Sequence, residues 1–306
     1  MATLTQSPPP PASAGAPVAA RRSAVPQISW NWLGVVPFFL FVFAFLVLPS
    51  SRLITDSFQD AQGAFTLANF VDLFRDPLIL LAYRNSIEIG VATSLIGGVF
   101  GFLVAYAITL GNTPTWIRSG LLTYSGIAAN FGGVPLAFAF IATVGRTGFL
   151  TGLLRGAGYD IYQHGFSLYT FLGLLLAYNY FQFPLMVLTI APALEGLRAE
   201  WQEASKNLGA NAFQYWRDVA FPILMPSILG TMLLLFGSAF GAFATAQALT
   251  GGTLVLASLL IGTEIRGDTL GNANLGYALA VGMVVVMAVT IGLYALLQRR
   301  ASRWLR

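Results

Sequence analysis

The chain contains no cysteine, one lysine and one histidine among its 306 residues. Without cysteine it can form no disulfide, no thiolate metal ligand and no cysteine nucleophile. The single histidine, His164, lies in a polar segment without clustered ligands, so we expect a solvated side chain and no metal site. The single lysine, Lys206, follows Ser205 and lies in no Gly-x-x-x-x-Gly-Lys-Ser/Thr loop, so the chain lacks this ATP-binding motif.

Charge is also scarce, because only 9% of the residues are charged while 56% are hydrophobic. An average soluble domain carries about 25% charged residues, so we expect most of this chain to lie in lipid. The basic residues of such a chain report its orientation in the membrane and not an affinity for nucleic acid. The apolar segments contain no Ser-His-Asp set, metal cluster or carboxylate pair, so we expect no enzyme activity.

A helix needs roughly 20 apolar residues to cross a bilayer, and six segments meet this requirement to within a few residues at each end. They are 31–54, 86–110, 120–143, 168–192, 223–247 and 275–297. The expected fold is an all-α membrane protein with a first helix at 31–54 and a core over 86–297, within a domain of residues 31–306. Residues 1–30 are rich in proline, alanine and serine and should form a disordered tail. Small residues in the second helix would allow close helix packing: Gly90, Gly97, Gly98 and Gly101.

The basic residues set the orientation. If both termini are cytoplasmic, the inside holds Arg21, Arg22, Arg118, Arg198, Lys206, Arg217, Arg299, Arg300, Arg303 and Arg306. These are ten of the sixteen basic residues, which leaves six outside and satisfies the positive-inside rule. The loop 193–222, between helices four and five, then faces the cytoplasm.

The loop 193–222 carries the most specific pattern in the chain. Glu203, Ala204 and Ser205 are followed after three residues by Gly209, and nine residues later by the run Val-Ala-Phe-Pro that ends at Pro222. Residues 194–208 favour a helix, which Gly209 can end in a left-handed conformation. Asn211 and Gln214 can then form a capping box at the start of a second helix. The alternative is an interfacial loop in which Glu-Ala-Ser is incidental.

This pattern resembles the EAA loop of bacterial ABC importer permeases, with Ser205 in place of the second alanine. The likeness covers roughly residues 31–306, and the stretch 239–252 is similar to the spermidine/putrescine-type branch. The resemblance implies a multi-pass subunit of the bacterial inner membrane. It also implies three kinds of protein partner: a second six-span permease, two cytoplasmic ATPase subunits and an extracytoplasmic solute-binding protein. ATP and Mg²⁺ would bind to the ATPase, and this chain would need no cofactor.

By position, the resemblance assigns the ATPase contact to Glu203, Ala204, Ser205, Gly209 and Pro222. The solute is expected to be polyamine-like, with sulfate, ferric iron or a phosphonate as alternatives. Two rival classes are a secondary transporter and a channel or assembly subunit. Ion coupling in a secondary transporter would need buried acids or histidines. The only acid clearly within a predicted span is Glu88, which we expect to pair with Arg84.

Several uncharged polar residues also lie within the predicted spans. Because polar groups are costly in hydrocarbon, they tend to face a bundle interior or a water-filled path. They therefore either line the translocation path or form hydrogen bonds that hold neighbouring helices together, and the sequence leaves both possibilities open. These residues are Asn130, Tyr178, Asn179, Gln182 and Gln247.

Overall fold

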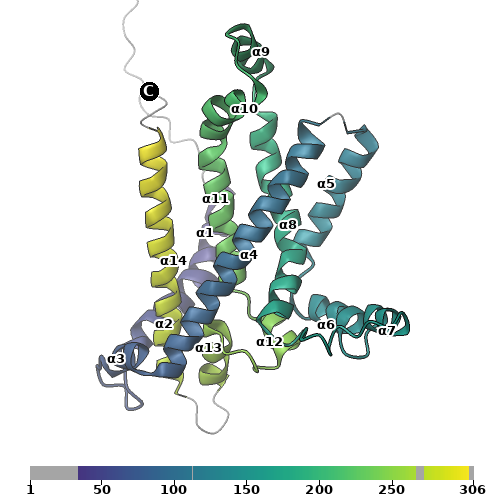
Figure 1. The fold of residues 1–306 in the computed structure, drawn as a ribbon. Helices are drawn as coiled ribbons and strands as arrows, with labels where there is room; N and C mark the ends of the chain where they lie inside the picture. Colours follow the sequence, from purple (N-terminus) through teal and green to yellow (C-terminus); the bar gives the residue numbers. More distant parts are fainter. Residues whose placement is uncertain (1–33, 112, 267–271, 303–306) are drawn as a thin grey trace, which may run out of the picture. The chain divides into compact units, whose positions relative to one another are not determined.

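The protein is almost entirely helical in the residues that the computed structural model describes, which are 34–111, 113–266 and 272–302 (Figure 1). The predicted tail, 1–30, lies outside these ranges. The chain divides into two compact units, Met1–Pro49 and Ser50–Arg306. In the first unit, α1 (Val36–Val42) continues through the π-helical turn η2 (Phe43–Val47) into α2 (Leu48–Ser57), which ends in the second unit.

Three long helices that pack against one another form the centre of the second unit: α4 (Pro77–Thr109), α8 (Phe171–Glu195) and α11 (Phe221–Phe240). The other elements of this unit are α3 (Ala68–Arg75), α5 (Thr115–Asn130), α6 (Gly133–Val144), α7 (Phe149–Gly156), α9 (Ala199–Asn207), α10 (Ala212–Tyr215), the π-helical turn η3 (Trp216–Ala220), α12 (Ala244–Thr250), α13 (Ala257–Arg266) and α14 (Ala273–Ser302). Of these, α5 packs on α8 and α14 packs on α11.

Six helical segments of the described residues are long and apolar enough to cross a membrane, which confirms the predicted all-α class and the number of spans. They are Val36–Ser57, Pro77–Thr109, Gly133–Gly156, Phe171–Glu195, Ala212–Phe240 and Ala273–Leu296. The third segment consists of α6 and α7 and only partly overlaps the predicted third span, 120–143. The second begins earlier than the predicted residue 86 because Asp76 caps it. The Asp76 carboxylate accepts a hydrogen bond of 2.7 Å from the N–H of Leu78, and Pro77 suits the first helical position.

The predicted third helix, 120–143, is instead two helices, because the chain breaks at Phe131 and Gly132 between α5 and α6. Gly133 has a φ of +72°, which side-chain-bearing residues rarely adopt, and it redirects the chain. Pro135 lies in the first turn of α6, where its missing N–H leaves no bond unmade. In Figure 1, α5 runs beside α4 and α8, whereas α6 and α7 lie across the end of these helices.

The predicted fifth helix, 223–247, also contains a break, because α11 ends at Phe240 and α12 begins at Ala244. The freed carbonyl of Ala242 accepts hydrogen bonds from the hydroxyls of Tyr178 (3.2 Å) and Ser258 (3.1 Å). Neighbouring side chains thus satisfy the backbone where the helix stops, as a membrane interior requires. Apolar residues continue through both breaks, so hydropathy alone does not locate them.

The close packing of α4 against its neighbours depends on glycine, as predicted. A Cβ atom at Gly97 would lie 2.7 Å from the Cβ of Gln182, and one at Gly101 would lie 2.5 Å from the Cβ of Met186. Both distances are far below ordinary contact, so α4 and α8 could not approach this closely with larger residues. The glycines that face α8 or α11 in this way are Gly90, Gly97, Gly98 and Gly101.

The elements of the second unit collect at two ends (Figure 1). We call one the α9 end, because it contains α9 and α10 together with the end of α4, the start of α5 and the C-terminal end of α14. We call the other the α12 end, because it contains α12 together with α3, α6, α7 and α13.

Candidate functional site

The loop 193–222 forms a short helical element at the α9 end (Figure 1). The sequence predicts one helix over 194–208, but α8 ends at Glu195 with Gly196 as its C-cap, and α9 begins at Ala199. The rest of the prediction is confirmed, because α9 is followed by a turn at Gly209 and a second helix, α10. We call α9, the turn and α10 together the α9–α10 element.

Gly209 adopts the left-handed conformation expected of it, with a φ of +82°. Its N–H donates to the carbonyl of Lys206 at 2.9 Å, and the N–H of Ala210 donates to the carbonyl of Ser205 at 3.0 Å. This pair of hydrogen bonds is a Schellman motif, which ends a helix in a defined direction. A Cβ atom at Gly209 would meet nothing within 4 Å. Backbone conformation, and not crowding, therefore requires a glycine here.

The second helix of the element begins with the predicted capping box. The N–H of Gln214 donates to Asn211 Oδ1 at 2.9 Å, and the N–H of Asn211 donates to Gln214 Oε1 at 2.8 Å. From Ala212 the helix then continues through η3 and α11 to Phe240. The wider turn of η3 precedes Pro222, the second residue of α11, which has no N–H to donate.

The predicted contact residues of α9 do not all face outward. Glu203 and Ala204 are exposed, and so is Gly209. Ser205 is buried, and its hydroxyl donates to the carbonyl of Gln202 at 2.8 Å. Ser205 therefore supports the helix from its inner side in this conformation.

Two apolar side chains beside the Gly209 turn were not identified from the sequence. Leu208 is 88% exposed and Phe213 is 72% exposed. Exposed apolar surface that is grouped on one element marks interaction sites, and these two side chains lie five positions apart on an otherwise polar element. The signal that could have found them is a leucine and a phenylalanine on either side of a helix-ending glycine.

Two of the polar residues predicted within the spans join helices. Tyr178 and Gln182 share one face of α8, and both are fully buried. Gln182 Nε2 donates to the carbonyl of Leu235 on α11 at 2.9 Å and to Thr93 Oγ1 on α4 at 3.4 Å. Gln182 thus connects the three central helices, and Tyr178 supports the break after α11 through Ala242.

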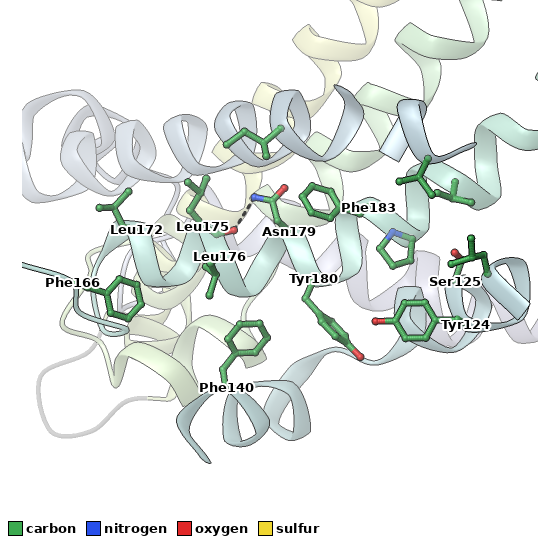
Figure 2. A pocket seen from close by; sticks show the side chains of 15 residues that line it. Tyr124, Ser125, Phe140, Phe166, Leu172, Leu175, Leu176, Asn179, Tyr180 and Phe183 are labelled. Carbon is green, nitrogen blue, oxygen red and sulfur yellow. Dashed lines mark hydrogen bonds between the residues drawn. The ribbon is translucent and has the colours of Figure 1, made fainter. Parts of the chain in front are cut away.

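Asn179 lies beside them and lines a cavity of about 810 Å³ between α4, α5 and α8 (Figure 2). Its Nδ2 donates to the carbonyl of Leu175 at 2.8 Å, while its Oδ1 is buried without a hydrogen-bond partner among the described residues. The cavity offers few polar contacts, because the side chains around Asn179 are mostly apolar or aromatic. Those labelled in Figure 2 are Tyr124, Ser125, Phe140, Phe166, Leu172, Leu175, Leu176, Tyr180 and Phe183.

The remaining two polar residues lie at the α12 end. Asn130 is the last residue of α5 and lines a smaller pocket, of about 350 Å³, where the two helix breaks meet. Gln247 is half-buried within α12 and does not line this pocket. The five predicted residues therefore do not form one site. Of the two pockets that they line, the one that contains Asn130 is the more polar.

The acid predicted within a span is paired, as expected. Arg84 Nε donates to Glu88 Oε1 at 2.7 Å, one helical turn apart on α4. Both side chains are largely exposed, at 73% and 48%. Glu88 is therefore not a buried acid of the kind that ion coupling requires.

The segment between α7 and α8 contains an ion pair. Asp160 Oδ2 accepts from Arg155 Nε at 3.1 Å, and Asp160 Oδ1 accepts from the N–H of Tyr162 at 3.0 Å. Desolvation alone would raise the pKa of Asp160, but these hydrogen bonds and the charge of Arg155 lower the pKa below its ordinary value. His164 is exposed and stacks on Tyr159 with 4.5 Å between ring centroids. The described residues contain no group of three potential metal ligands.

Known proteins resemble this chain in sequence. The family model described as "Binding-protein-dependent transport system inner membrane component" matches residues 136–303, more than half of the chain. The sulfate transport system permease protein CysT of Salmonella typhimurium is 29% identical over 69% of this chain and 72% of that protein. The spermidine/putrescine transport system permease protein PotB of Haemophilus influenzae is 29% identical over 87% of this chain and 90% of that protein. Equal identity to both relatives leaves the two solute classes undistinguished.

Solved structures resemble the fold. The crystal structure of a bacterial ABC transporter involved in the import of the acidic polysaccharide alginate matches with a TM-score of 0.71 and 18% identity, over 88% of this chain and 95% of that one. A structure of a bacterial alginate ABC transporter in complex with a periplasmic protein bound to alginate pentasaccharide matches with a TM-score of 0.69 and 15% identity, over 88% of this chain and 94% of that one. At these identities the likeness supports the fold alone.

Proposed function

This chain belongs to the family of binding-protein-dependent transport system inner membrane components and is the permease subunit of an ABC importer, and we propose that its α9–α10 element couples it to a cytoplasmic ATPase. In this proposal the ATPase binds ATP and Mg²⁺. The permease converts hydrolysis into movement of its own helices.

The observation that carries this proposal is the exposure of Leu208 and Phe213 beside the Gly209 turn. The Schellman motif and the capping box on either side fix the direction of both helices. The apolar pair is therefore presented on a pre-organised support, which reduces the cost of docking. Full burial of each side chain against a partner would contribute about 1.5–3 kcal/mol. Glu203 adds an exposed charge to the same element.

We propose that both termini are cytoplasmic. The C-terminal end of α14 and the α9–α10 element lie at the same end of the second unit (Figure 1). If the α9–α10 element contacts a cytoplasmic ATPase, the C-terminal end of α14 must therefore also be cytoplasmic. The excess of arginines and lysine in the loops assigned to the inside supports this orientation.

The proposed assembly contains a second six-span permease, two ATPase subunits and an extracytoplasmic binding protein, and each permease forms half of the translocation path. Support comes from the family description, which names a binding-protein-dependent system. The similar alginate transporter structure is in complex with a periplasmic protein. The α12 end would face that binding protein.

The proposed solute is a small polyamine, and sulfate is the alternative named by an equally similar relative. Asn130 and Asn179 are the two predicted polar residues that line a cavity, and both are uncharged. Such groups hydrate an ion without trapping it, which suits a protein that must release its cargo. Uptake into vesicles that contain the complete complex should be measured with putrescine, spermidine and sulfate. Uptake of sulfate alone would exclude the polyamine and leave the importer function intact.

Charge placed on Phe213 tests the coupling proposal. Phe213→Asp should reduce recovery of the ATPase with the tagged permease by about tenfold or more, because burial of the ring is lost. Phe74→Asp is a matched control, because Phe74 is 78% exposed and belongs to α3, which lies at the α12 end and outside the six segments that could cross a membrane. Its recovery of the ATPase should equal that of the unmodified chain. Equal recovery with Phe213→Asp, or no ATPase with the unmodified chain, would contradict the proposal.

A further inference from the structure

The contact between α11 and α14 carries two concave surfaces of opposite character. On the side that faces α4, a pocket of about 570 Å³ is lined mainly by leucine, valine and methionine side chains, and we call it the apolar pocket. On the side that faces α8, a groove of about 400 Å³ is lined mainly by polar side chains, and we call it the hydroxyl groove. Residues 229–236 of α11 line the first surface and residues 226–234 line the second, so the two lie at overlapping depths. The polar residues of the hydroxyl groove are Thr189, Ser227, Thr231, Tyr294 and Gln298.

Hydroxyl groups form different hydrogen bonds on the two surfaces. In the apolar pocket, the hydroxyls of Ser94 and Thr290 each donate to a carbonyl one turn earlier in their own helix, at 3.0 Å and 2.8 Å. Such a bond satisfies a hydroxyl group that has no water beside it. In the hydroxyl groove, the hydroxyls of Ser227 and Thr231 form no hydrogen bond with the described residues, although Thr231 is only 7% exposed. Because an unpaired hydroxyl group is costly in hydrocarbon, this side favours water or a polar ligand over lipid.

Tyr294 lies between the two surfaces and holds α14 against α11. Its hydroxyl donates to the carbonyl of Pro226 at 3.2 Å. Gly230 permits this approach, because a Cβ atom at that position would lie only 3.1 Å from the tyrosine hydroxyl. The hydroxyl of Thr189 also has an acceptor, because it donates to a carbonyl of α8 at 2.8 Å. These bonds order the walls of the groove, and they leave the two unpaired hydroxyls of α11 to bind a ligand.

The hydroxyl groove runs from the middle of α11 toward the α9 end. The 20 residues of α11 extend about 30 Å, which matches the hydrocarbon core of a bilayer. Thr231 is the eleventh of these residues, so it lies near the middle of the helix. Gln298 lies near the C-terminal end of α14, which belongs to the α9 end (Figure 1). The groove therefore connects the membrane interior with the α9 end.

The same face of α11 leads from the groove to the smaller pocket at the α12 end. Ser227, Thr231 and Ser238 are separated by four and seven residues, a spacing that places them on one face of a helix. Ser238 lines the pocket of about 350 Å³ where the two helix breaks meet. Its hydroxyl likewise has no hydrogen-bond partner in the part of the chain that the structure describes. A row of unpaired hydroxyl groups thus follows α11 over more than half of its length.

We propose that the hydroxyl groove binds the transported solute in the cytoplasmic half of the path, and that it takes a small polar solute with part of its hydration shell. Hydroxyl and amide groups both donate and accept hydrogen bonds, so they can replace water around a cation or an anion. None of the lining residues is charged, so the groove can release its ligand. In the proposed assembly the second permease supplies the opposite wall. The inference rests on the proposed function, because the groove leads to the cytoplasm only if the α9 end is cytoplasmic.

Cysteine modification tests whether the groove holds water. The chain has no cysteine, so Ser227→Cys and Leu229→Cys would each carry the only thiol of the permease. Both positions are half-buried on α11, but Leu229 lines the apolar pocket. The reactive species is the thiolate, which needs water to form. In vesicles of the complete complex with the cytoplasmic side outward, a charged, membrane-impermeant methanethiosulfonate should therefore modify Ser227→Cys at least tenfold faster than Leu229→Cys.

The same modification tests whether the solute passes through the groove. When the Ser227→Cys complex is modified before insertion into vesicles, uptake should fall at least tenfold, and dithiothreitol should restore it. Equal modification rates at the two positions, or full uptake by the modified Ser227→Cys complex, would overturn the proposal. Modification only from the opposite side of the membrane would overturn the proposed orientation and the cytoplasmic placement of the groove. The rate difference between Ser227→Cys and Leu229→Cys would then still show a water-filled groove, so the two failures are distinguishable.

Substitution of Thr231 tests direct contact with the solute. Thr231→Val keeps the branched side chain but removes the hydroxyl, so the maximal rate of uptake should fall about fivefold, the effect of one lost hydrogen bond. Recovery of the ATPase with the tagged permease should not change, and Thr231→Ser should restore uptake. The control is Thr290→Val, because the hydroxyl of Thr290 bonds only within α14. Equal effects of the two valine substitutions would reject a specific role for Thr231.

Uptake in these experiments is measured with putrescine, spermidine and sulfate. If the unmodified complex transports none of the three, the proposed solute is wrong. The modification rates of Ser227→Cys and Leu229→Cys do not depend on the solute and would still decide whether the groove holds water.

Discussion

Replacement of Gly209 by valine isolates the contribution of backbone conformation to coupling. A Cβ atom at this position meets no neighbour within 4 Å, so the substitution introduces no clash. The φ of +82° is nevertheless unfavourable for a β-branched residue. Strain of this kind costs about 1–3 kcal/mol, which corresponds to a reduction of about 5- to 150-fold in the population of the native turn. Affinity for the ATPase should fall by the same factor.

The assay is uptake and solute-stimulated ATPase activity in vesicles with matched amounts of inserted protein. Because Gly209 is exposed and a side chain there meets no packed neighbour, the apparent melting temperature of Gly209→Val should stay within about 2 °C of the unmodified value. Gly209→Asn is the control, because asparagine tolerates the left-handed region, and it should retain most of the activity. Normal uptake by a well-inserted Gly209→Val protein would refute the reasoning, and so would equal losses in both variants.

Three further predictions concern packing, topology and pH. Gly101→Ala places a methyl group 2.5 Å from the Cβ of Met186 and should destabilise the protein by about 1–3 kcal/mol. The control is Gly120→Ala, which has open space around it and should not lower the melting temperature. Equal melting temperatures of the two variants would contradict the α4–α8 packing. An alkaline phosphatase fused after Arg306 should be inactive, and periplasmic activity would reverse the proposed topology. The pKa of Asp160 is lowered in the folded state. The ionised carboxylate therefore stabilises the segment between α7 and α8 fully above about pH 3.9, and this stabilisation is lost as the pH falls through the lower folded pKa. Amide exchange in that segment should rise on acidification of the unmodified protein, but not of Asp160→Asn.

Local chain chemistry was the part of the site that could be predicted. The Gly209 turn and the Asn211 capping box depend on residues within five positions of each other, and both have the predicted geometry. The exposure of Leu208 and Phe213 could not be predicted in the same way, because it depends on where the loop lies relative to the other helices.

The number of spans and the glycine-dependent packing of α4 also followed from the sequence. The helix breaks could not be predicted from the sequence, because contacts with distant residues stabilise them. The backbone at Gly133 is held by Thr245, 112 positions away, and the carbonyl of Ala242 is held by Tyr178, 64 positions away. Apolar composition continues across both breaks, so hydropathy does not separate the helices there. The local signals that mark the breaks are the glycines Gly132, Gly133 and Gly241.

The helix from Ala212 to Phe240 joins the two ends of the second unit as one rod. Its 29 residues extend about 44 Å at 1.5 Å per residue. One degree of tilt therefore displaces one tip by about 0.8 Å relative to the other. The hydrogen bond of 2.8 Å between Gly133 and Thr245 is lost beyond about 3.5 Å. A tilt of about one degree, if it passes through the break after Phe240, would therefore move α12 by about the distance that this hydrogen bond can lengthen before it is lost.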